Sequence, residues 1–435
     1  MLSHAENEMV TRVGPGTPLG NMMRRYWVPV CTSGEIAAKD SVPLRVRLLG
    51  ENFVAFRDTN GAVGVLDEMC MHRGASLALG RVEECGIRCL YHGWKFAVDG
   101  TILETPNHAD SRFKTRAKAP AYPVREAGGM VWAYLGPKEK QPPFTRYRFM
   151  DAAPENRCVV RVNVNANYLQ LWEGGADSSH VGILHSDMAR PGWLEKTFTP
   201  SSDQLNPGSL VSDDNAPRLE FEDTEFGFHY AAYRKTNRKQ NGVEVENCRI
   251  VPLIMPWTRI IPSPTNYYFV FEVAADDYNT STFLVIDGDQ PVDRERVIKI
   301  LGLDDPRFYS RETNNFLMTA SQCWGQDRAK MDKNWSGLRG LEQEDAVMSL
   351  SMGAIMDRTK EHLVTADRAV IRLRRRLIES IKQVQEGGDP IGAMIADMTK
   401  LTAIDIDLPV GSHWQDVASE NRKAASAPRV SVPAE

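Results

Sequence analysis

The sequence has few cysteines, no long apolar run and no excess of positive charge. Its 435 residues include seven cysteines, an odd number that is too small for a disulfide framework. No eighteen consecutive residues are apolar, and the first thirty lack an apolar signal core, so we expect no membrane span and a cytoplasmic location. The 57 acidic residues outnumber the 52 basic ones, which argues against a nucleic-acid partner because phosphate recognition needs clustered positive charge.

The composition is that of a folded chain with more than one core. Hydrophobic residues make up 42% and charged residues 25%, which are ordinary globular values, and the chain is about three times the length of a typical domain. Short apolar runs separated by turn signals predict a small antiparallel β domain in the first third. These runs are Leu44–Leu49, Phe53–Phe56 and Val63–Leu66. The polar, proline-containing stretch Gly136–Pro143 predicts a domain boundary.

The rest of the chain mixes strands and helices. A mostly helical segment is predicted at Tyr168–His185, and a long helix at about Glu342–Glu386, where apolar residues recur at helical spacing. The end of the chain is rich in alanine, serine and proline, which predicts a flexible tail. Strands are predicted at Arg157–Val164, Phe226–Tyr233, Cys248–Ile254, Thr258–Ile261, Tyr267–Val273 and Thr282–Ile286.

Two mixed cysteine–histidine pairs form the strongest motif. Cys70 and His72 make up the first pair, Cys89 and His92 make up the second, and sixteen residues separate the pairs. A single zinc ion is one candidate, but zinc fingers typically draw cysteines from one pair and histidines from the other. A Rieske [2Fe–2S] cluster explains the mixing, because each loop then gives one thiolate to one iron and one imidazole to the other. The cluster is therefore preferred, with zinc as the alternative.

A second candidate metal-binding segment is DSSHVGILH at residues 177–185. Asp177 and His180 are three residues apart and would share one helical face. His180 and His185 would lie about 140° apart on a regular helix. Both can reach one metal ion only if the helix is distorted or ends between them, and a break at Gly182 would achieve this.

Together these motifs resemble the oxygenase (alpha) component of Rieske non-haem iron ring-hydroxylating oxygenases. The resemblance rests on the cysteine–histidine motif at residues 70–92, the run YHGWKF at Tyr91–Phe96 and the segment at residues 177–185. With the opening GPGTPLGNMMRRYWVPV, these motifs are most similar to the phthalate dioxygenase-like branch. Glu173 departs from the pattern, because many members have asparagine there.

The resemblance implies an α+β protein in which an all-β Rieske domain precedes a catalytic domain of the helix-grip type. A helix-grip domain is an antiparallel sheet wrapped by helices. The implied parts are residues 1–40 packing on the catalytic domain, residues 41–141 as the Rieske domain, residues 142–412 as the catalytic domain, and residues 413–435 as the flexible tail.

The resemblance also implies a mononuclear Fe(II) held by two histidines and one carboxylate, a set that leaves positions open for O2. His180 and His185 are the implied imidazoles. The family places the carboxylate on a late helix, where the chain has the run GLEQEDAV. Asp345 is the preferred ligand in that run, with Glu342 and Glu344 as alternatives.

Asp177 matches the aspartate through which, in the family, the cluster of one subunit passes electrons to the iron of its neighbour. The resemblance implies a homotrimer or a stacked hexamer, and a separate NADH-dependent reductase as electron donor. The implied reaction inserts both atoms of O2 into an aromatic ring and gives a cis-dihydrodiol. A monooxygenase or O-demethylase of a methoxylated aromatic acid is the first alternative, and a Rieske electron-transfer protein without oxygenase activity is the second.

An aromatic carboxylate is the predicted substrate, with phthalate or a substituted benzoate as leading candidates. A buried carboxylate needs a cationic partner, and the planar fork of arginine binds it through two hydrogen bonds. Arg218 and Arg249 each lie in an apolar, strand-like run and look like the two pocket arginines of phthalate-type relatives. An edge-strand or interface salt bridge is the alternative role for both. Ser179, beside His180, is the candidate for a further hydroxyl contact.

Overall fold

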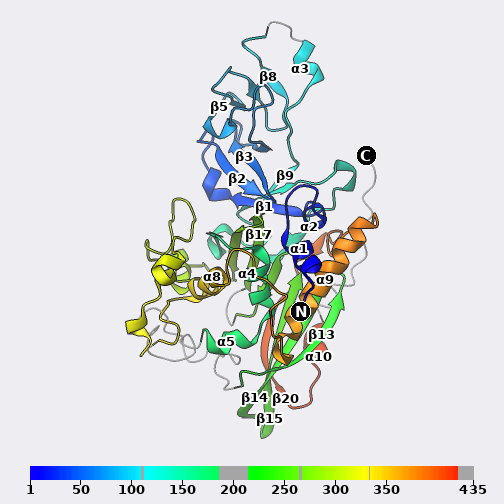
Figure 1. The fold of residues 1–435 in the computed structure, drawn as a ribbon, viewed down its shortest axis with the longest axis vertical. Helices are drawn as coiled ribbons and strands as arrows, with labels where there is room; N and C mark the ends of the chain where they lie inside the picture. Colours follow the sequence, from blue (N-terminus) through cyan, green and yellow to red (C-terminus); the bar gives the residue numbers. More distant parts are fainter. Residues whose placement is uncertain (109–111, 186–213, 264–266, 333, 420–435) are drawn as a thin grey trace. The chain divides into compact units, whose positions relative to one another are not determined.

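The computed structural model describes residues 1–108, 112–185, 214–263, 267–332 and 334–419 (Figure 1). The chain divides into two compact units. The first is Val13–Pro142, and the second joins Met1–Arg12 to the residues from Pro143 onward. None of the described helices is both long and apolar enough to cross a lipid bilayer.

The unit Val13–Pro142 contains three small antiparallel sheets, and its short strands include those predicted from the sequence. The strands are joined in the orders β2-β3-β4, β5-β6-β7-β8 and β1-β10-β9. Their bounds are β1 Trp27–Thr32, β2 Leu44–Leu48, β3 Glu51–Arg57, β4 Val63–Asp67, β5 Arg81–Glu83, β6 Gly86–Arg88, β7 Lys95–Phe96, β8 Ile102–Glu104, β9 Val124–Ala127 and β10 Met130–Tyr134, with helices α2 Pro18–Met23 and α3 Arg112–Arg116.

The start of this unit differs from the prediction that residues 1–40 pack on the catalytic domain. Only Met1–Arg12 belongs to the other unit, and residues 13–40 belong to this one. The physical reason is strand pairing, because β1 forms an antiparallel ladder with β10 from Trp27 to Thr32. Nearly all residues of β1 are buried, and this burial of apolar surface further stabilises the unit Val13–Pro142.

The second unit is built on an antiparallel sheet of eight strands, in agreement with the predicted fold class. The order is β12-β18-β17-β16-β15-β14-β13, and β20 pairs with the first half of β15. The predicted strands all occur, β13 begins in the strand-like run around Arg218, and β20 was not predicted. The bounds are β12 Arg157–Val164, β13 Arg218–Thr224, β14 Gly227–Gln240, β15 Val243–Ile254, β16 Thr258–Ile261, β17 Tyr267–Asp276, β18 Asn279–Asp287 and β20 Ile404–Pro409, and a separate pair consists of β11 Arg146–Tyr147 and β19 Asp397–Met398.

Helices pack around this sheet (Figure 1). The central helix α4 packs against β16 and β17 and also against α1, α8 and α9, while α9 packs against β13 and β14. Buried apolar side chains of β12, β17 and β18 join those of α4, α7 and α8 in one core. The helices are α1 His4–Thr11, α4 Tyr168–Ala176, α5 Ser179–Ile183, α7 Arg294–Ile300, α8 Leu341–Ser351, α9 Arg368–Gln385 and α10 Trp414–Val417.

The described end of the chain departs from the predicted tail. That prediction covers residues 413–435, of which residues 420–435 lie outside the described residues. The described part forms α10, in which the Trp414 side chain is fully buried. The backbone N–H of Trp414 donates to the hydroxyl of Tyr233 at 2.9 Å, so the packed core extends beyond residue 412.

The long helix predicted at Glu342–Glu386 is two helices, α8 and α9, joined by a segment that carries a buried arginine. Arg358 in this segment is fully buried and forms two hydrogen bonds of 2.9 Å to the carboxylate of Glu173 in α4. Arg374 of α9 donates to the same carboxylate at 2.6 Å. A buried charge is costly unless it is paired, so the Glu173 interactions fix the path of the chain between the helices.

We predict that Glu173→Gln lowers the free energy of unfolding by about 3–5 kcal/mol, because it leaves the buried Arg358 without its carboxylate. Burial raises the pKa of Glu173, but Arg358 and Arg374 outweigh it and hold the pKa below its ordinary value. The stabilisation is therefore present above about pH 4.5 and is lost as the pH falls further. Denaturant unfolding at pH 7 and pH 3.5 measures both effects.

The matched control is Glu312→Gln, which removes an exposed carboxylate from the same unit. It should leave the unfolding midpoint unchanged. Equal midpoints for Glu173→Gln and Glu312→Gln at pH 7 would contradict the stabilising role of the buried pair.

Candidate metal centres

The two cysteine–histidine loops have the same backbone turn. Cys70 lies just after β4 and Cys89 just after β6. In each loop the glycine four residues later donates its backbone N–H to the cysteine carbonyl, Gly74 at 2.8 Å and Gly93 at 3.0 Å. Both glycines have positive φ, near 72°, a conformation that a residue with a side chain rarely adopts. The two loops therefore have the same turn, and each carries one cysteine and one histidine.

The side chains of these loops meet as a thiol pair and an imidazole pair. Burial raises the pKa of Cys70 to about 11, and the adjacent thiol of Cys89 adds to this shift. The ring centroids of His72 and His92 lie 4.5 Å apart. The two thiols lie together and the two imidazoles lie together. A two-iron cluster of this kind binds two thiolates at one iron and two imidazoles at the other. This arrangement fits a two-iron cluster better than the zinc ion considered from the sequence.

One side of the histidine pair is packed and the other is exposed. The indole of Trp94 stacks on His72 at 4.6 Å and is held by a 2.7 Å hydrogen bond to Asn107. Tyr91 and Leu90, at the tip of the second loop, are 57% and 60% exposed. The loop tips therefore offer apolar surface next to the imidazoles.

The histidines of the second site are brought together by a short helix. α4 ends at Ala176, Asp177 lies outside it, and α5 contains His180 but ends at Ile183. His185 therefore lies beyond the end of α5. The predicted break occurs one residue later than Gly182, and Asp177 and His180 do not share a helix. Ending α5 after one turn frees His185 from the 140° offset that a regular helix would impose.

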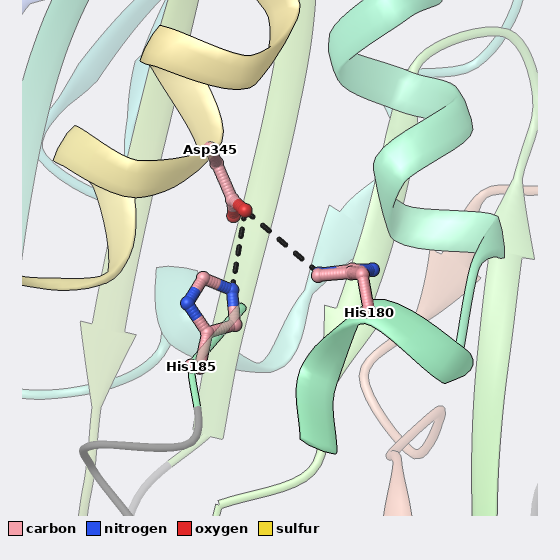
Figure 2. A group of neighbouring side chains, drawn as sticks. All are labelled: His180, His185 and Asp345. Carbon is pink, nitrogen blue, oxygen red and sulfur yellow. Dashed lines mark ion pairs between the residues drawn. The ribbon is translucent and has the colours of Figure 1, made fainter. Parts of the chain in front are cut away.

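His180, His185 and Asp345 form a compact group of three metal-binding side chains (Figure 2). One oxygen of Asp345 lies 3.1 Å from Nε2 of His185 and 3.8 Å from Nε2 of His180. One ligand atom from each residue lies within 4.8 Å of the others. Two imidazoles and one carboxylate on one side of a metal are the set used by non-haem Fe(II) oxygenases.

The second nitrogen of each ring faces a different carboxylate. Nδ1 of His180 lies 3.5 Å from Asp177, and Nδ1 of His185 lies 2.8 Å from Glu344. Both rings therefore present Nε2 to Asp345. This geometry favours Asp345 over Glu344 as the third ligand, because Glu344 is already bonded to the far side of His185.

Glu342, the other alternative, differs from Asp345 in its pKa. Burial raises its pKa well above the ordinary value, and the nearby carboxylate of Glu272 adds to this shift. The pKa of Asp345 is shifted in the opposite direction. Burial would raise it, but His185 and His180 lower it to about 2. Burial lowers the pKa of His185, but the carboxylates of Asp345 and Glu344 outweigh burial and raise this pKa to about 10. A metal cation bound here would take the place of a proton that these carboxylates favour on His185.

The two arginines predicted to bind substrate lie on opposite faces of the sheet. In the register of the sheet Arg249 is opposite Ala232, whereas Arg218 is opposite the next residue of β14, Tyr233. Successive residues of a strand point to opposite faces. Arg249 is buried, with an ion pair of 3.6 Å to Asp405.

The prediction for Arg218 is therefore corrected. Its side chain is 51% exposed, pairs with Glu220 and Glu246, and lies over the ring of Tyr233 at 4.0 Å. The ring of Tyr233 belongs to the core around Trp414 on the face away from Arg249. Arg218 thus has the edge-strand salt-bridge role that the sequence left open.

Arg234 is the arginine that the sequence analysis missed. It lies two residues after Ala232 and so shares the face of Arg249. Its guanidinium is buried and donates to the backbone carbonyl of Ser178, at 2.5 Å, and to its hydroxyl, at 2.9 Å. Ser178 immediately precedes α5, so Arg234 lies beside the helix that carries His180. Its position at the end of the apolar run FGFHYAAY was the available sequence signal.

We predict that His180→Ala and Asp345→Ala each lose one metal ion per chain, because each removes one of the three metal-binding side chains that meet here among the described residues. The signals of the cluster should stay intact, since its ligands lie in the other unit. Iron content by mass spectrometry and the visible and EPR spectra measure the two effects. The matched control is His362→Ala, which removes an exposed histidine; three irons per chain in Asp345→Ala would reject the ligand set.

Comparisons with known proteins agree with both centres. Residues 26–123 match the family described as Rieske [2Fe-2S] domain, and residues 133–434 match the family described as LigXa C-terminal domain like. The chain is 37% identical to the phthalate 4,5-dioxygenase oxygenase subunit of Pseudomonas putida, over 96% of this chain and 94% of that protein. It is 34% identical to the 3-chlorobenzoate-3,4-dioxygenase oxygenase subunit of Comamonas testosteroni, over 90% and 92% of the two chains.

A solved structure has the same fold. It is the terminal oxygenase of carbazole 1,9a-dioxygenase from Nocardioides aromaticivorans, which covers 87% of this chain and 98% of its own at 17% identity and a TM-score of 0.55. The chain therefore belongs to the Rieske non-haem iron oxygenases, as the oxygenase (alpha) subunit that carries a [2Fe–2S] cluster and a mononuclear iron.

Proposed function

We propose that this protein is the oxygenase component of a two-component dioxygenase that cis-dihydroxylates an aromatic carboxylate such as phthalate or a substituted benzoate. A separate NADH-dependent reductase supplies the electrons, and the working form is a cytoplasmic homotrimer or stacked hexamer. The observation that carries the substrate class is the pair of buried arginines, Arg234 and Arg249, on the sheet face next to α5.

The two metal groups are held by the side chains that meet in each unit. When bound, the cluster and the iron together supply the electron transfer and O2 activation that the reaction needs. The cluster ligands are Cys70, His72, Cys89 and His92, and the iron ligands are His180, His185 and Asp345.

Asp177 is the link between the two centres. It lies 3.5 Å from Nδ1 of His180, and its other oxygen accepts the backbone N–H of Ser179 at 2.7 Å. Its side chain is 28% exposed, which leaves it accessible to a cluster histidine of a neighbouring copy. A carboxylate bonded to a ligand imidazole fixes the ring, and one shared by two imidazoles also shortens the path for an electron.

The arginine pair is prepared for an anion. Burial, and then the charge of Arg249, lowers the pKa of Arg234 to about 10, which reflects the cost of burying one charge near another of the same sign. Within the described residues, Nη1 of Arg234 and the hydroxyl oxygen of Ser179 are buried without a hydrogen-bond partner. A substrate carboxylate would accept hydrogen bonds from these groups and offset the repulsion. This extends the predicted substrate contacts of Arg249 and Ser179 to Arg234.

The reaction type is tested by turnover under ¹⁸O₂ with a reductase, NADH and a panel of aromatic acids. We expect both labelled atoms in a dihydrodiol, because two histidines and one carboxylate would leave positions on a bound iron open for O2. One labelled atom, or formaldehyde from a methoxylated acid, would support the monooxygenase or O-demethylase instead. If the protein has a reducible cluster and two irons per chain but takes up no oxygen, the result would support the alternative of a Rieske electron-transfer protein without oxygenase activity.

The substrate class is tested by changing the arginines separately. Arg249→Ala and Arg234→Ala should raise the KM for the acid by about 10- to 100-fold, because each removes a charge-assisted contact. Arg218→Ala is the control, since Arg218 lies on the opposite face of the sheet, and should leave the KM unchanged. Normal KM values in both buried-site variants, with iron content intact, or a better neutral aromatic substrate would exclude a carboxylate at this site.

A further inference from the structure

We propose that Glu344 is a positioning residue of the iron site, which fixes the orientation and tautomer of His185 so that Nε2 is directed to the metal. The proposal rests on the proposed function, because it assumes a metal bound by His180, His185 and Asp345. It assigns separate tasks to two consecutive acids of α8. Asp345 faces Nε2 of His185, and Glu344 holds Nδ1 of the same ring.

The geometry around Glu344 excludes a second role as a metal ligand. One carboxylate oxygen lies 2.8 Å from Nδ1 of His185, and the other accepts the hydroxyl of Ser336 at 2.5 Å. The Glu344 side chain is 1% exposed. A carboxylate this deeply buried needs both hydrogen bonds, and moving it toward the metal would break them.

Ser336 is itself held by a closed turn. Its hydroxyl oxygen accepts the backbone N–H of Leu338 at 3.1 Å, and the side-chain amide of Asn334 donates to the carbonyl of Leu338 at 2.9 Å. The carbonyl oxygen of that amide accepts the N–H of Gly337 at 2.6 Å, where φ is +68°. The turn therefore fixes Ser336, which fixes Glu344, which fixes the ring of His185.

The pair formed by Glu344 and His185 parallels the pair formed by Asp177 and His180. In both pairs the carboxylate lies next to Nδ1 of the histidine, and Nε2 of the same ring faces Asp345. A neutral imidazole that donates its Nδ1–H to a carboxylate has its free lone pair on Nε2, and the bond also makes that nitrogen a stronger ligand. Asp177 is partly exposed and can reach another chain, whereas Glu344 is enclosed. Glu344 therefore acts on the metal site only through His185.

Metal affinity tests this role independently of turnover. The mononuclear iron is removed by a chelator that spares the cluster, and binding of Fe(II) or Co(II) is then measured by competition with a coloured chelator. Glu344→Ala should weaken binding by about 10- to 100-fold, the range for loss of an outer carboxylate. Glu344→Gln should recover most of this affinity, because the amide oxygen still accepts the Nδ1–H.

Ser336→Ala and Glu312→Gln complete the experiment. Ser336→Ala removes the support but keeps the carboxylate and should weaken binding by a smaller factor, and Glu312→Gln, which changes an exposed acid, should have no effect. Ser336→Ala and Glu344→Gln also keep the test decisive if Glu344→Ala does not fold. Wild-type affinity and an unchanged Co(II) spectrum in Glu344→Ala, or no recovery by Glu344→Gln, would overturn the proposal. Failure of the wild-type protein itself to bind metal would instead reject the proposed function.

Discussion

An imidazole can serve a metal site only when its ring is turned so that one nitrogen faces the metal, and this constraint organises the catalytic unit. Asp177 and Glu344 hold the Nδ1 atoms of His180 and His185, and both Nε2 atoms then face Asp345. Each carboxylate must be held in turn, since a loose acid would not fix a ring. A backbone N–H holds Asp177, and a hydroxyl in a closed turn holds Glu344.

The sheet beneath the site accommodates charge that most sheet faces exclude. Arg259 of β16 pairs with Glu272 of β17 at 2.7 Å, and Arg234 and Arg249 lie further along the same face. Buried charges of this kind are weak sources of stability, because desolvation offsets their attraction. Fixed charges on this face would instead serve the aromatic carboxylate that we propose as substrate. Among the described residues, Nη1 of Arg234 is buried on this face without a hydrogen-bond partner.

Much of the protein could be predicted from local sequence because the metal-binding motifs are local. Cys70 and His72 lie in one short loop and Cys89 and His92 in another, and strand-like runs of the sequence predicted most strands of the large sheet. Where long-range pairing decided the outcome, prediction failed. Residues 13–40 join the Rieske unit because β1 pairs with β10, which lies about 100 residues later. The helix predicted at Glu342–Glu386 is interrupted, and the buried Arg358 in the interruption binds Glu173 in α4, 185 residues away in sequence.

Residue types and their spacing define the available chemistry: a cysteine–histidine set for a cluster, two histidines five residues apart, and a late helix with three acids. The roles that we propose for the three acids depend on packing, because Glu342, Glu344 and Asp345 all carry a carboxylate and differ in the side of His185 or the part of the core that they face. The same holds for the arginines. Strand register, which a single residue's shift would reverse, places Arg234 and Arg249 on the site's face of the sheet and Arg218 on the other.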